Sequence, residues 1–329
     1  PPRSTRKESS AASDVYKRQR SLIIIIFQNE EGGLFGSKVM TTGLTSKDLE
    51  LISSSGLSIR DGINKIGGNV DNIQSAKLSK GDWAAYVELH IEQGGILDDE
   101  KIDIGIVQGI VGIKQWDVTV TGFSNHAGTT PMDKRKDALY AAAQYVQFVH
   151  EIGKNTPGRQ VATVGEIQSY PGAPNVVPGL VKTSLEIRDL DGKKINSIFK
   201  KIKTASAKIA RQTQTTFKFE PTISIVPQPA DRRISRYINI AVDQLKLSNK
   251  YLPSGAGHDA QEMTQICPIG MIFIPSKEGI SHSPTEYSSP EDITNGANVL
   301  LNTVLTVSYT HLRAHETDSY LVCRLLLEK

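Results

Sequence analysis

The chain has little cysteine and no long apolar run, and its composition is not biased toward any one residue class. Its 329 residues include two cysteines, Cys267 and Cys323, which are too few for a disulfide framework and favour a reducing, cytoplasmic compartment. The longest aliphatic run, residues 22–27, is far shorter than the ~20 residues that a membrane helix needs. With 38% hydrophobic and 22% charged residues, the chain is also neither collagen-like nor of low complexity. We therefore expect a globular protein.

An excess of one charge is also absent once the two ends are set apart. Residues 14–19 can be encoded by GATGTGTATAAGAGACAG, whose reverse complement, read in another frame, begins with the codons for residues 307–312. Such an inverted repeat resembles a transposon adaptor translated by mistake, so we interpret residues 1–19 and 307–329 as non-native tails. We expect the native chain to begin upstream of Arg20, which makes this chain a fragment.

The charge balance of the remaining residues argues against two classes of partner. The tails hold five and three of the 38 basic residues, and two and three of the 35 acidic residues. Residues 20–306 therefore carry 30 charges of each sign, and the apparent basic character comes from the tails. We expect no nucleic-acid partner and no membrane partner.

The pattern of apolar residues predicts an α/β sheet domain in two pieces. Apolar runs at residues 21–27, 83–90 and 269–274 are typical of buried strands in an open sheet, and the first two end in polar or Gly-rich loops. In the second piece, apolar residues also recur at the spacing of helices. Helices are predicted at residues 234–247 and 289–306, and a Gly-rich turn into a helix at residues 254–266. We assign residues 20–111 and 227–306 to this domain.

Between the two pieces, the order of elements changes to strand, helix, strand, strand, helix, strand. This βαββαβ order indicates a split ferredoxin-like α+β domain, inserted at residues 112–226. Alternating residues predict its strands at 114–121, 161–168, 181–189 and 216–226, and helical spacing predicts its helices at 137–150 and 193–213. The fold class is therefore α/β, with an open mixed sheet and an inserted α+β domain.

Metal-capable side chains follow the predicted strands at Glu30-Glu31, at His90 with Glu92, and at His282. In open α/β sheets ligands gather beyond the carboxyl ends of strands, so these residues could converge. A hydrolytic metal site needs nitrogen and oxygen ligands, an open position for water and a nearby carboxylate as proton acceptor. Each signal alone also fits a structural role, because loop glutamates are usually solvated and a strand-end histidine is usually hydrogen-bonded.

Seven segments in order carry a family resemblance. They are Phe27-Gln28-Asn29-Glu30-Glu31-Gly32, Glu88-Leu89-His90-Ile91-Glu92-Gln93-Gly94, Asn125-His126-Ala127-Gly128-Thr129-Thr130-Pro131-Met132, Pro174-Asn175-Val176-Val177-Pro178-Gly179, Glu186-Ile187-Arg188-Asp189, Ser254-Gly255-Ala256-Gly257-His258-Asp259-Ala260 and Ser281-His282-Ser283-Pro284-Thr285-Glu286. Residues 20–306 resemble the amidohydrolase branch of the two-metal aminoacylase and carboxypeptidase-like hydrolases. That branch contains N-carbamoyl-L-amino-acid hydrolases, ureidopropionases and allantoate amidohydrolases.

The resemblance implies a zinc-exopeptidase-like catalytic domain with two divalent metal ions per subunit, zinc or manganese, with cobalt or nickel as alternatives. It implies that Glu30 is the general base and that Glu31, His90 and His282 are metal ligands. The family's other ligands, a His-x-Asp and a bridging Asp, would lie upstream of Arg20, because no His-x-Asp occurs in this chain. We therefore expect the activity in the full-length parent and at most half of a metal site here.

The resemblance also implies how a small carboxylate substrate binds. Arg188 and Asn175 would hold its carboxylate, and Gln93 and His258 would line its pocket. His126 would stabilise the oxyanion in the partner subunit's site, because the inserted domain is expected both to form a homodimer and to close as a lid. From the residues alone, however, Arg188 also fits a strand-end ion pair, and His258 fits a helix cap.

The resemblance implies metal-dependent hydrolysis of the carbamoyl or ureido C–N bond of an N-carbamoyl-L-amino acid or allantoate, with release of ammonia. Two alternatives stay open. One is an aminoacylase or dipeptidase on the same scaffold, since those substrates also carry a carboxylate. The other is a non-catalytic dimeric binding protein whose metal site has decayed, against which the presence of Glu30, Glu31, His90 and His282 argues.

Overall fold

The computed structural model describes residues 21–309, which divide into two compact units. The first unit comprises residues 21–107, 230–252 and 258–309 of the described chain, and the second comprises Gln108–Pro229 and Pro253–Gly257. The predicted tails lie almost wholly outside the described residues, as does Cys323. The exception is residues 307–309, which continue the last helix, α10 (Pro290–Tyr309). No helix in the described range is both long and apolar enough to cross a membrane.

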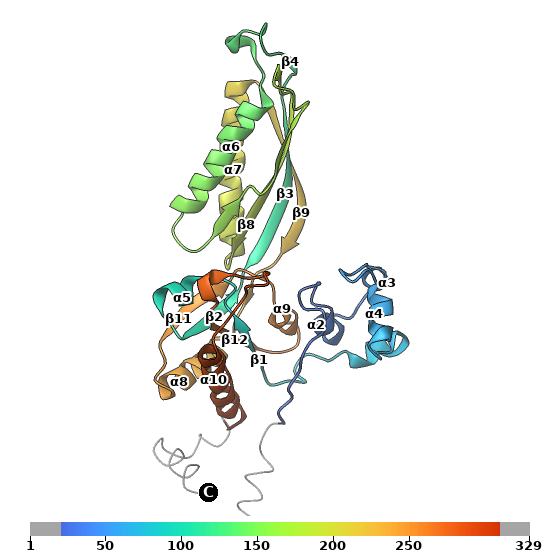
Figure 1. Cartoon of the computed structure of the whole chain (residues 1–329), viewed down its shortest axis with the longest axis vertical. Coiled ribbons are helices and arrows are strands. Elements are labelled where there is room, and N and C mark those ends of the chain that lie inside the picture. The colour runs from blue at the N-terminus through green and yellow to red at the C-terminus, as the bar shows by residue number, and fades with distance from the viewer. Residues whose placement is uncertain (1–20, 310–329) are drawn as a thin grey trace, which may run out of the picture. The chain divides into compact units, whose positions relative to one another are not determined.

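The first unit is built on a mixed sheet, which confirms the predicted fold class (Figure 1). Strand β1 (Tyr86–Ile91) runs parallel to β12 (Ile269–Ile274), and β12 runs antiparallel to β2 (Ile104–Ile110). Strand β2 also pairs with β11 (Asn249–Ser254) and, at its far end, with β10 (Gln228–Pro229). The sheet confirms the strands expected near residues 83–90 and 269–274. Strands β2 and β11 were not predicted.

Two helices cover one face of this sheet. Apolar residues of α8 (Arg232–Gln244) and α10 pack with Ile272 and Ile274 of β12 and with Ile104 and Ile106 of β2. Alternate residues of β1, including Val87 and Leu89, join the same core. Because successive side chains of a strand point to opposite faces, Tyr86, Glu88 and His90 lie on the other face. This alternation provides the polar side chains of the site described below.

The prediction of a buried strand at residues 21–27 is wrong. This segment has no regular structure, and Leu22, Ile24 and Ile26 are 60%, 84% and 86% exposed. A strand needs a neighbour for its backbone hydrogen bonds. Strand β1 ends the row of described strands, and no described strand lies beside residues 21–27. Apolar composition alone therefore does not produce a strand here.

Several short helices that the sequence did not predict complete the first unit. Four of them are α2 (Phe35–Met40), α3 (Ser46–Leu49), α4 (Ile59–Lys65) and the 3-10 helix η1 (Val70–Ala76). These surround a small core of their own that includes Phe35, Leu44 and Ile59. The remaining unpredicted ones are α5 (Ile96–Glu100) and the 3-10 turn η3 (Lys277–Gly279). Helix α9 (Asp259–Met263) lies within the Gly-rich turn and helix expected at 254–266, and β11 ends at the first residue of that range.

The second unit has the predicted ferredoxin-like order. Its strands are β3 (Gly112–Thr121), β5 (Val161–Thr163), β6 (Ile167–Tyr170), β8 (Leu180–Asp189) and β9 (Thr216–Ile225). They form an antiparallel sheet in the order β5-β8-β3-β9, with β6 also paired to β8. The strand expected at 161–168 is therefore two short strands on one neighbour.

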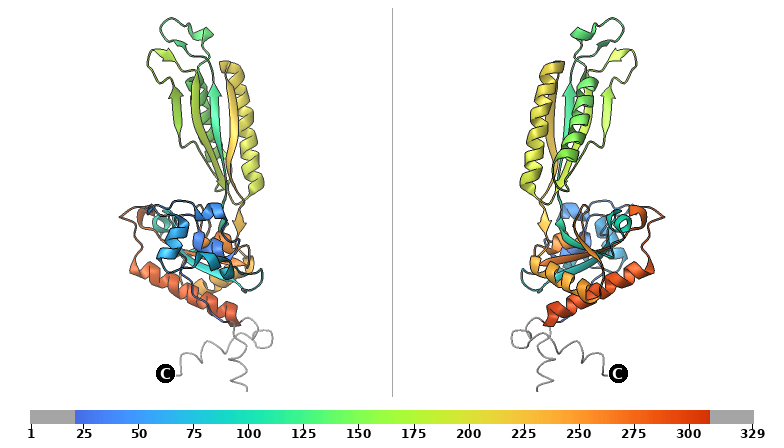
Figure 2. Two further views of the ribbon diagram at one scale, coloured as in Figure 1. Left: turned by 90° about the vertical axis from the view of Figure 1, so that its right-hand side faces the viewer. Right: turned by 90° about the vertical axis from the view of Figure 1, so that its left-hand side faces the viewer.

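Two long helices cover one face of this second sheet, as Figure 2 shows from both sides. They are α6 (Ala138–Asn155) and α7 (Gly192–Thr213), each capped by an aspartate, Asp137 and Asp191. Their apolar faces enclose a core that includes Tyr145, Ile198 and Ile202. Beyond the end of β3 lie the short pair β4 (Asn125–His126) and β7 (Val176–Val177), followed by the turn η2 (Met132–Lys134).

Gly122, between β3 and β4, offers a sharp test of this packing. A Cβ atom at Gly122 would lie 2.0 Å from the backbone carbonyl oxygen of Lys136, which no side-chain rotation can relieve. Gly62, inside α4, has nothing within 4 Å of its Cβ position. We expect Gly122→Ala to lower the free energy of unfolding by about 3 kcal/mol and Gly62→Ala to raise it by about 1 kcal/mol. Urea unfolding measures both, and equal effects would contradict this description.

Candidate metal and hydrolytic site

Three side chains of the first unit bring ligand atoms together. One carboxylate oxygen of Glu30 and one ring nitrogen each of His90 and His258 lie within 4.8 Å of one another. Glu30 comes from the loop before α2, His90 from β1, and His258 from the residue that precedes α9. The sequence had assigned these residues three different roles. The structure places them in one cluster.

The loop that carries Glu30 is held by its own backbone. The amides of Gly33 and Leu34 donate to the Glu30 carbonyl, and the Gly36 amide donates to the carbonyl of Gln28. Gly33 has a φ of 126°, a conformation that glycine adopts without strain. This tight turn fixes the backbone from which Glu30 and Glu31 project.

Glu30 lies in an environment that disfavours its charge. Burial raises its pKa to about 7, with further contributions from the negative charges of Glu31 and Asp259, while His282 acts in the opposite direction. A carboxyl group with a pKa close to neutral can both accept and return a proton, which is what general acid–base catalysis requires.

His90 presents a defined ring nitrogen to the cluster. Its Nδ1 lies 2.8 Å from the carbonyl oxygen of Ile91, which can only accept, so Nδ1 carries the proton in this contact. In a neutral imidazole, Nε2 then has the lone pair that a metal ion binds. Proteins usually orient a metal-binding histidine in this way, with the other ring N–H donating to a carbonyl or carboxylate.

His258 is almost fully buried and lies edge-on to His90, with 4.4 Å between the ring centroids. Burial, and secondarily the charge of His90, lowers the pKa of His258 to about 3. The ring is therefore neutral at ordinary pH and can act as a metal ligand or hydrogen-bonding group. Its Nδ1 lies 3.8 Å from carboxylate oxygens of both Glu30 and Glu88.

Sequence reasoning assigned no role to Glu88, although it lies two residues before His90 on the same face of β1. Its Oε2 accepts hydrogen bonds from the Tyr86 hydroxyl, at 2.9 Å, and from the Ala260 amide, at 2.8 Å. Burial raises the pKa of Glu88 to about 7. Asp259, also buried, has a raised pKa for the same reason. The period-two spacing with His90 was the signal that could have identified Glu88.

A second group contains the other two predicted ligands. The Nε2 atom of His282 lies 3.2 Å from Oε2 of Glu31 and 3.4 Å from Nε2 of Gln93. His282 has a φ of 54°, and its amide donates to Glu286. Gln93 also has a positive φ, and its amide donates to the buried Ser276 hydroxyl. These backbone contacts hold His282 and Gln93, and the side chains of His282 and Glu31 are largely exposed.

The donor chemistry of both groups fits a divalent metal ion. Imidazole nitrogens and carboxylate oxygens are the ligands that zinc and manganese take in hydrolytic sites. A cation would also relieve the repulsion among Glu30, Glu31 and Asp259. The first unit can therefore hold metal, whereas the number and identity of the ions stay predictions.

Glu92, which the sequence offered as a possible ligand, accepts hydrogen bonds from backbone amides instead. Its two carboxylate oxygens accept from the amides of Ile96 and Leu97, at 3.0 and 2.8 Å. These amides are at the start of α5, where helix N–H groups have no partner within the helix. Glu92 therefore caps α5.

The remaining predicted residues, His126, Asn175 and Arg188, belong to the second unit. His126 and Asn175 lie close together, since β4 pairs with β7 and the Ala127 amide donates to the Asn175 carbonyl. Arg188 lies near the opposite end of β8, opposite Ile113 of β3. The eight residue-to-residue steps from Leu180 to Arg188 span about 26 Å. One chain therefore does not bring Asn175 and Arg188 to the same carboxylate.

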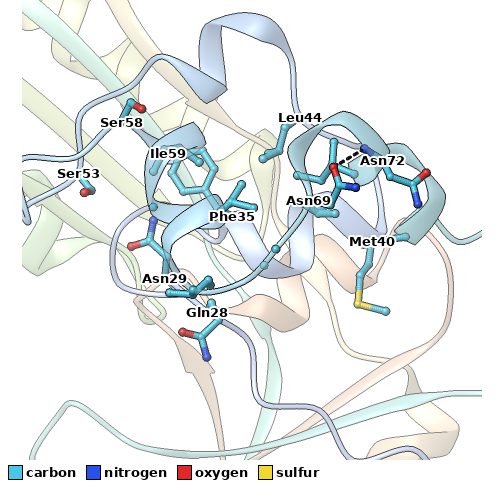
Figure 3. Close-up of a pocket in the computed structure, with 18 of the residues that line it drawn as sticks. Gln28, Asn29, Phe35, Met40, Leu44, Ser53, Ser58, Ile59, Asn69 and Asn72 are labelled. Atoms are coloured by element: carbon cyan, nitrogen blue, oxygen red, sulfur yellow. Dashed lines mark hydrogen bonds between the residues drawn. The ribbon is translucent and has the colours of Figure 1, made fainter.

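A cavity of about 670 Å³ lies elsewhere in the first unit (Figure 3). It is lined mostly by apolar residues of α2, α4 and η1, including Phe35 and Ile59, with amides such as Asn29 and Asn69 at its edge. Its lining contains no histidine, aspartate or glutamate. The cavity therefore lacks groups for hydrolytic chemistry and is distinct from the two polar groups.

Comparison with known proteins agrees with this arrangement. The profile of Peptidase family M20/M25/M40 matches residues 10–306. The chain is 37% identical over 286 residues to the N-carbamoyl-L-amino acid amidohydrolase of Geobacillus stearothermophilus, covering 85% of this chain and 70% of that protein. It is 36% identical over 306 residues to the ureidoglycolate hydrolase of Arabidopsis thaliana, covering 89% of this chain and 64% of that protein.

A solved structure shows the same likeness. The amidase of the hydantoinase/carbamoylase family from Burkholderia multivorans superposes with a TM-score of 0.76 at 32% identity. The match covers 84% of this chain and 66% of that chain. The shared arrangement therefore extends over nearly all of the described residues, and these relatives are longer than the part that this chain spans.

The environment of Glu30 makes a prediction for the metal-free protein. The Glu30 carboxyl should titrate near pH 7, and Glu31→Gln should lower its pKa, because a neighbouring negative charge is removed. Carbon-13 NMR of the glutamate carboxyl signals between pH 4 and 9 measures this. Glu220→Gln, in the second unit, is the control and should leave the Glu30 signal unchanged. A Glu30 pKa near 4.5, or a rise in Glu31→Gln, would contradict the description.

Proposed function

Because this chain belongs to Peptidase family M20/M25/M40, we propose that the full-length protein hydrolyses the carbamoyl or ureido C–N bond of a small carboxylic acid. The observation that carries this proposal is the cluster of Glu30, His90 and His258 beside the Glu31–His282 contact. The relatives named above act on carbamoyl-amino acids and ureidoglycolate, which share a ureido group and a carboxylate. The expected substrates are N-carbamoyl-L-amino acids or allantoate, with ammonia as a product.

Metal binding is assigned to Glu31, His90 and His282, with zinc or manganese as the expected ions. Such ions, when bound, polarise the scissile carbonyl and lower the pKa of water. His282 and Glu31 already lie 3.2 Å apart, and His90 is oriented by the Ile91 carbonyl. His258, neutral and buried, can complete the donor set or contact the substrate.

Glu30 is assigned the proton transfers. Its carboxylate takes the proton of the attacking water and returns it to the leaving nitrogen, a cycle that a pKa near 7 permits in both directions. Burial of the side chain supports this role, because a solvated carboxylate with an ordinary pKa is a weak base.

The second unit is assigned to the substrate carboxylate and to dimer formation. Arg188 offers a planar fork of N–H donors that suits a carboxylate. Asn175 and His126 lie at the other end of β8, so they can serve the same substrate only from another subunit. We therefore propose a homodimer in which Arg188 of one chain and the Asn175–His126 pair of the other approach one site.

The general-base role predicts a separation of turnover from metal binding. Glu30→Gln in the full-length protein should lower kcat by about 10²- to 10⁴-fold while the bound metal, measured by atomic emission, is kept. His282→Ala is the matched variant and should lose metal as well as activity. Near-normal turnover in Glu30→Gln would refute the general-base role. Loss of metal would instead make Glu30 a ligand in the cluster with His90 and His258.

The carboxylate-binding role predicts the result of a conservative exchange. Arg188→Lys should raise KM for an N-carbamoyl-L-amino acid by about tenfold or more, because an ammonium cannot form the paired N–H bonds of a guanidinium. Lys218→Arg, on β9, is the control and should leave KM unchanged. Steady-state kinetics measures both, and an unchanged KM in Arg188→Lys would remove Arg188 from the substrate pocket.

A further inference from the structure

The guanidinium of Arg188 is held from the side by a neighbour on its own strand. Glu186 and Arg188 are two residues apart on β8, so their side chains share one face of the sheet. The Nε atom of Arg188 donates to Oε1 of Glu186 at 2.6 Å. Both side chains are mostly buried, with 30% of Arg188 and 21% of Glu186 exposed. A charged hydrogen bond in such a setting is stronger than one on the open surface.

Glu186 is itself held in place by the adjacent strand. Gln115 of β3 is its direct cross-strand partner, and the side-chain amide of Gln115 donates to Oε2 of Glu186. Each carboxylate oxygen of Glu186 therefore has a different donor. Burial alone would raise the pKa of Glu186, but the hydrogen bonds from Arg188 and Gln115, with the Arg188 charge, keep it below its ordinary value. Glu186 thus stays ionised at neutral pH.

A backbone carbonyl fixes the other side of the guanidinium. The Nη1 atom of Arg188 donates to the Gly255 carbonyl at 2.7 Å, within the same unit. The loop around Gly255 is itself ordered, because the Ser254 hydroxyl accepts from the Ala256 amide and donates to the Ala256 carbonyl. Arg188 is therefore held at two of its three nitrogens.

An arginine has five N–H donors. Glu186 takes the one on Nε, and Gly255 takes one of the two on Nη1. Within the described part of the chain, one N–H on Nη1 and both on Nη2 remain for a ligand. A carboxylate that approaches the end of the guanidinium can accept two parallel N–H bonds, one from Nη1 and one from Nη2.

We propose that Glu186, fixed by Gln115, is a positioning residue that presents the Nη1–Nη2 edge of Arg188 to the substrate carboxylate. This proposal rests on the proposed function, and it adds a source of selectivity for acids over neutral ureido compounds. Without Glu186 the guanidinium keeps its charge but loses its orientation. A carboxylate then binds less tightly, whereas a substrate without a carboxylate is unaffected.

The test compares an acid with its amide in the full-length protein. Glu186→Ala should raise KM for N-carbamoyl-L-alanine about tenfold, with kcat within about twofold of the unaltered protein. For N-carbamoyl-L-alaninamide, kcat/KM should not change, so the preference for the acid falls about tenfold. Glu186→Gln, which keeps one acceptor for Nε, should give a smaller loss. Equal losses for acid and amide, or no loss for the acid, would overturn the proposal.

Glu220→Gln is the matched control. Glu220 pairs with Lys218 two residues away on β9, in the same i, i+2 arrangement, but both side chains are more than half exposed. This variant should keep the full preference for the acid. A loss of preference as large as that in Glu186→Ala would mean that any acidic residue of the sheet has this effect, and would also overturn the proposal.

A second readout does not depend on turnover. Phenylglyoxal modifies free guanidinium groups, and peptide mass spectrometry gives the rate at Arg188. In this chain, Glu186→Ala should speed modification of Arg188 several-fold relative to Glu220→Gln. If the unaltered full-length protein hydrolyses neither N-carbamoyl-L-amino acids nor allantoate, the proposed function fails while this rate still tests the restraint by Glu186. An unchanged rate would overturn the restraint whatever the activity.

Discussion

The site depends on the crowding of carboxyl groups in a small, partly buried space. Glu30, Glu88 and Asp259 each have a raised pKa, chiefly because burial removes solvent, and the negative charges of nearby acidic residues raise the pKa of Glu30 and Glu88 further. The adjacent His258 is kept neutral by burial and does not supply a compensating charge. Such an arrangement favours either bound protons or a bound cation. This constraint links the fold, which forces the groups together, to the proposed hydrolysis, which uses a proton acceptor beside a metal ion.

The fold creates this crowding by simple means. Strand β1 places Val87 and Leu89 in the core under α8 and α10, so Glu88 and His90 must face the other way. On that face they meet His258 before α9 and Glu30 from the loop before α2. The same alternation on β8 aligns Glu186 with Arg188 in the second unit. The residues around Glu30 and the Glu186–Arg188 pair are thus both brought together by strand periodicity combined with loops of fixed backbone.

The sequence predicted an element best where its apolar pattern matches the neighbours that the element has in the structure. Strand β12 has the predicted bounds because all six of its residues are apolar and buried between neighbours on both sides. The ferredoxin-like order was also predictable, since each helix and strand has a regular period. Residues 21–27 show the limit, because their apolar run has no described neighbour to pair with. Glu92 shows another limit: its spacing from His90 fits a ligand, yet only the structure reveals that it caps α5. The separation of Asn175 from Arg188, 13 residues apart in sequence, likewise depends on β8 being extended.

The proposed hydrolysis requires that Glu31, His90 and His282 hold a divalent metal ion beside Glu30. Anomalous X-ray diffraction at the zinc absorption edge, from crystals of the full-length protein grown with zinc, tests it directly. We expect an anomalous peak at about 2.0–2.2 Å from Nε2 of His90 or from ligand atoms of Glu31 and His282, with the Glu30 carboxylate close by. Well-diffracting crystals with ordered Glu31, His90 and His282 side chains but no anomalous peak beside them would contradict it.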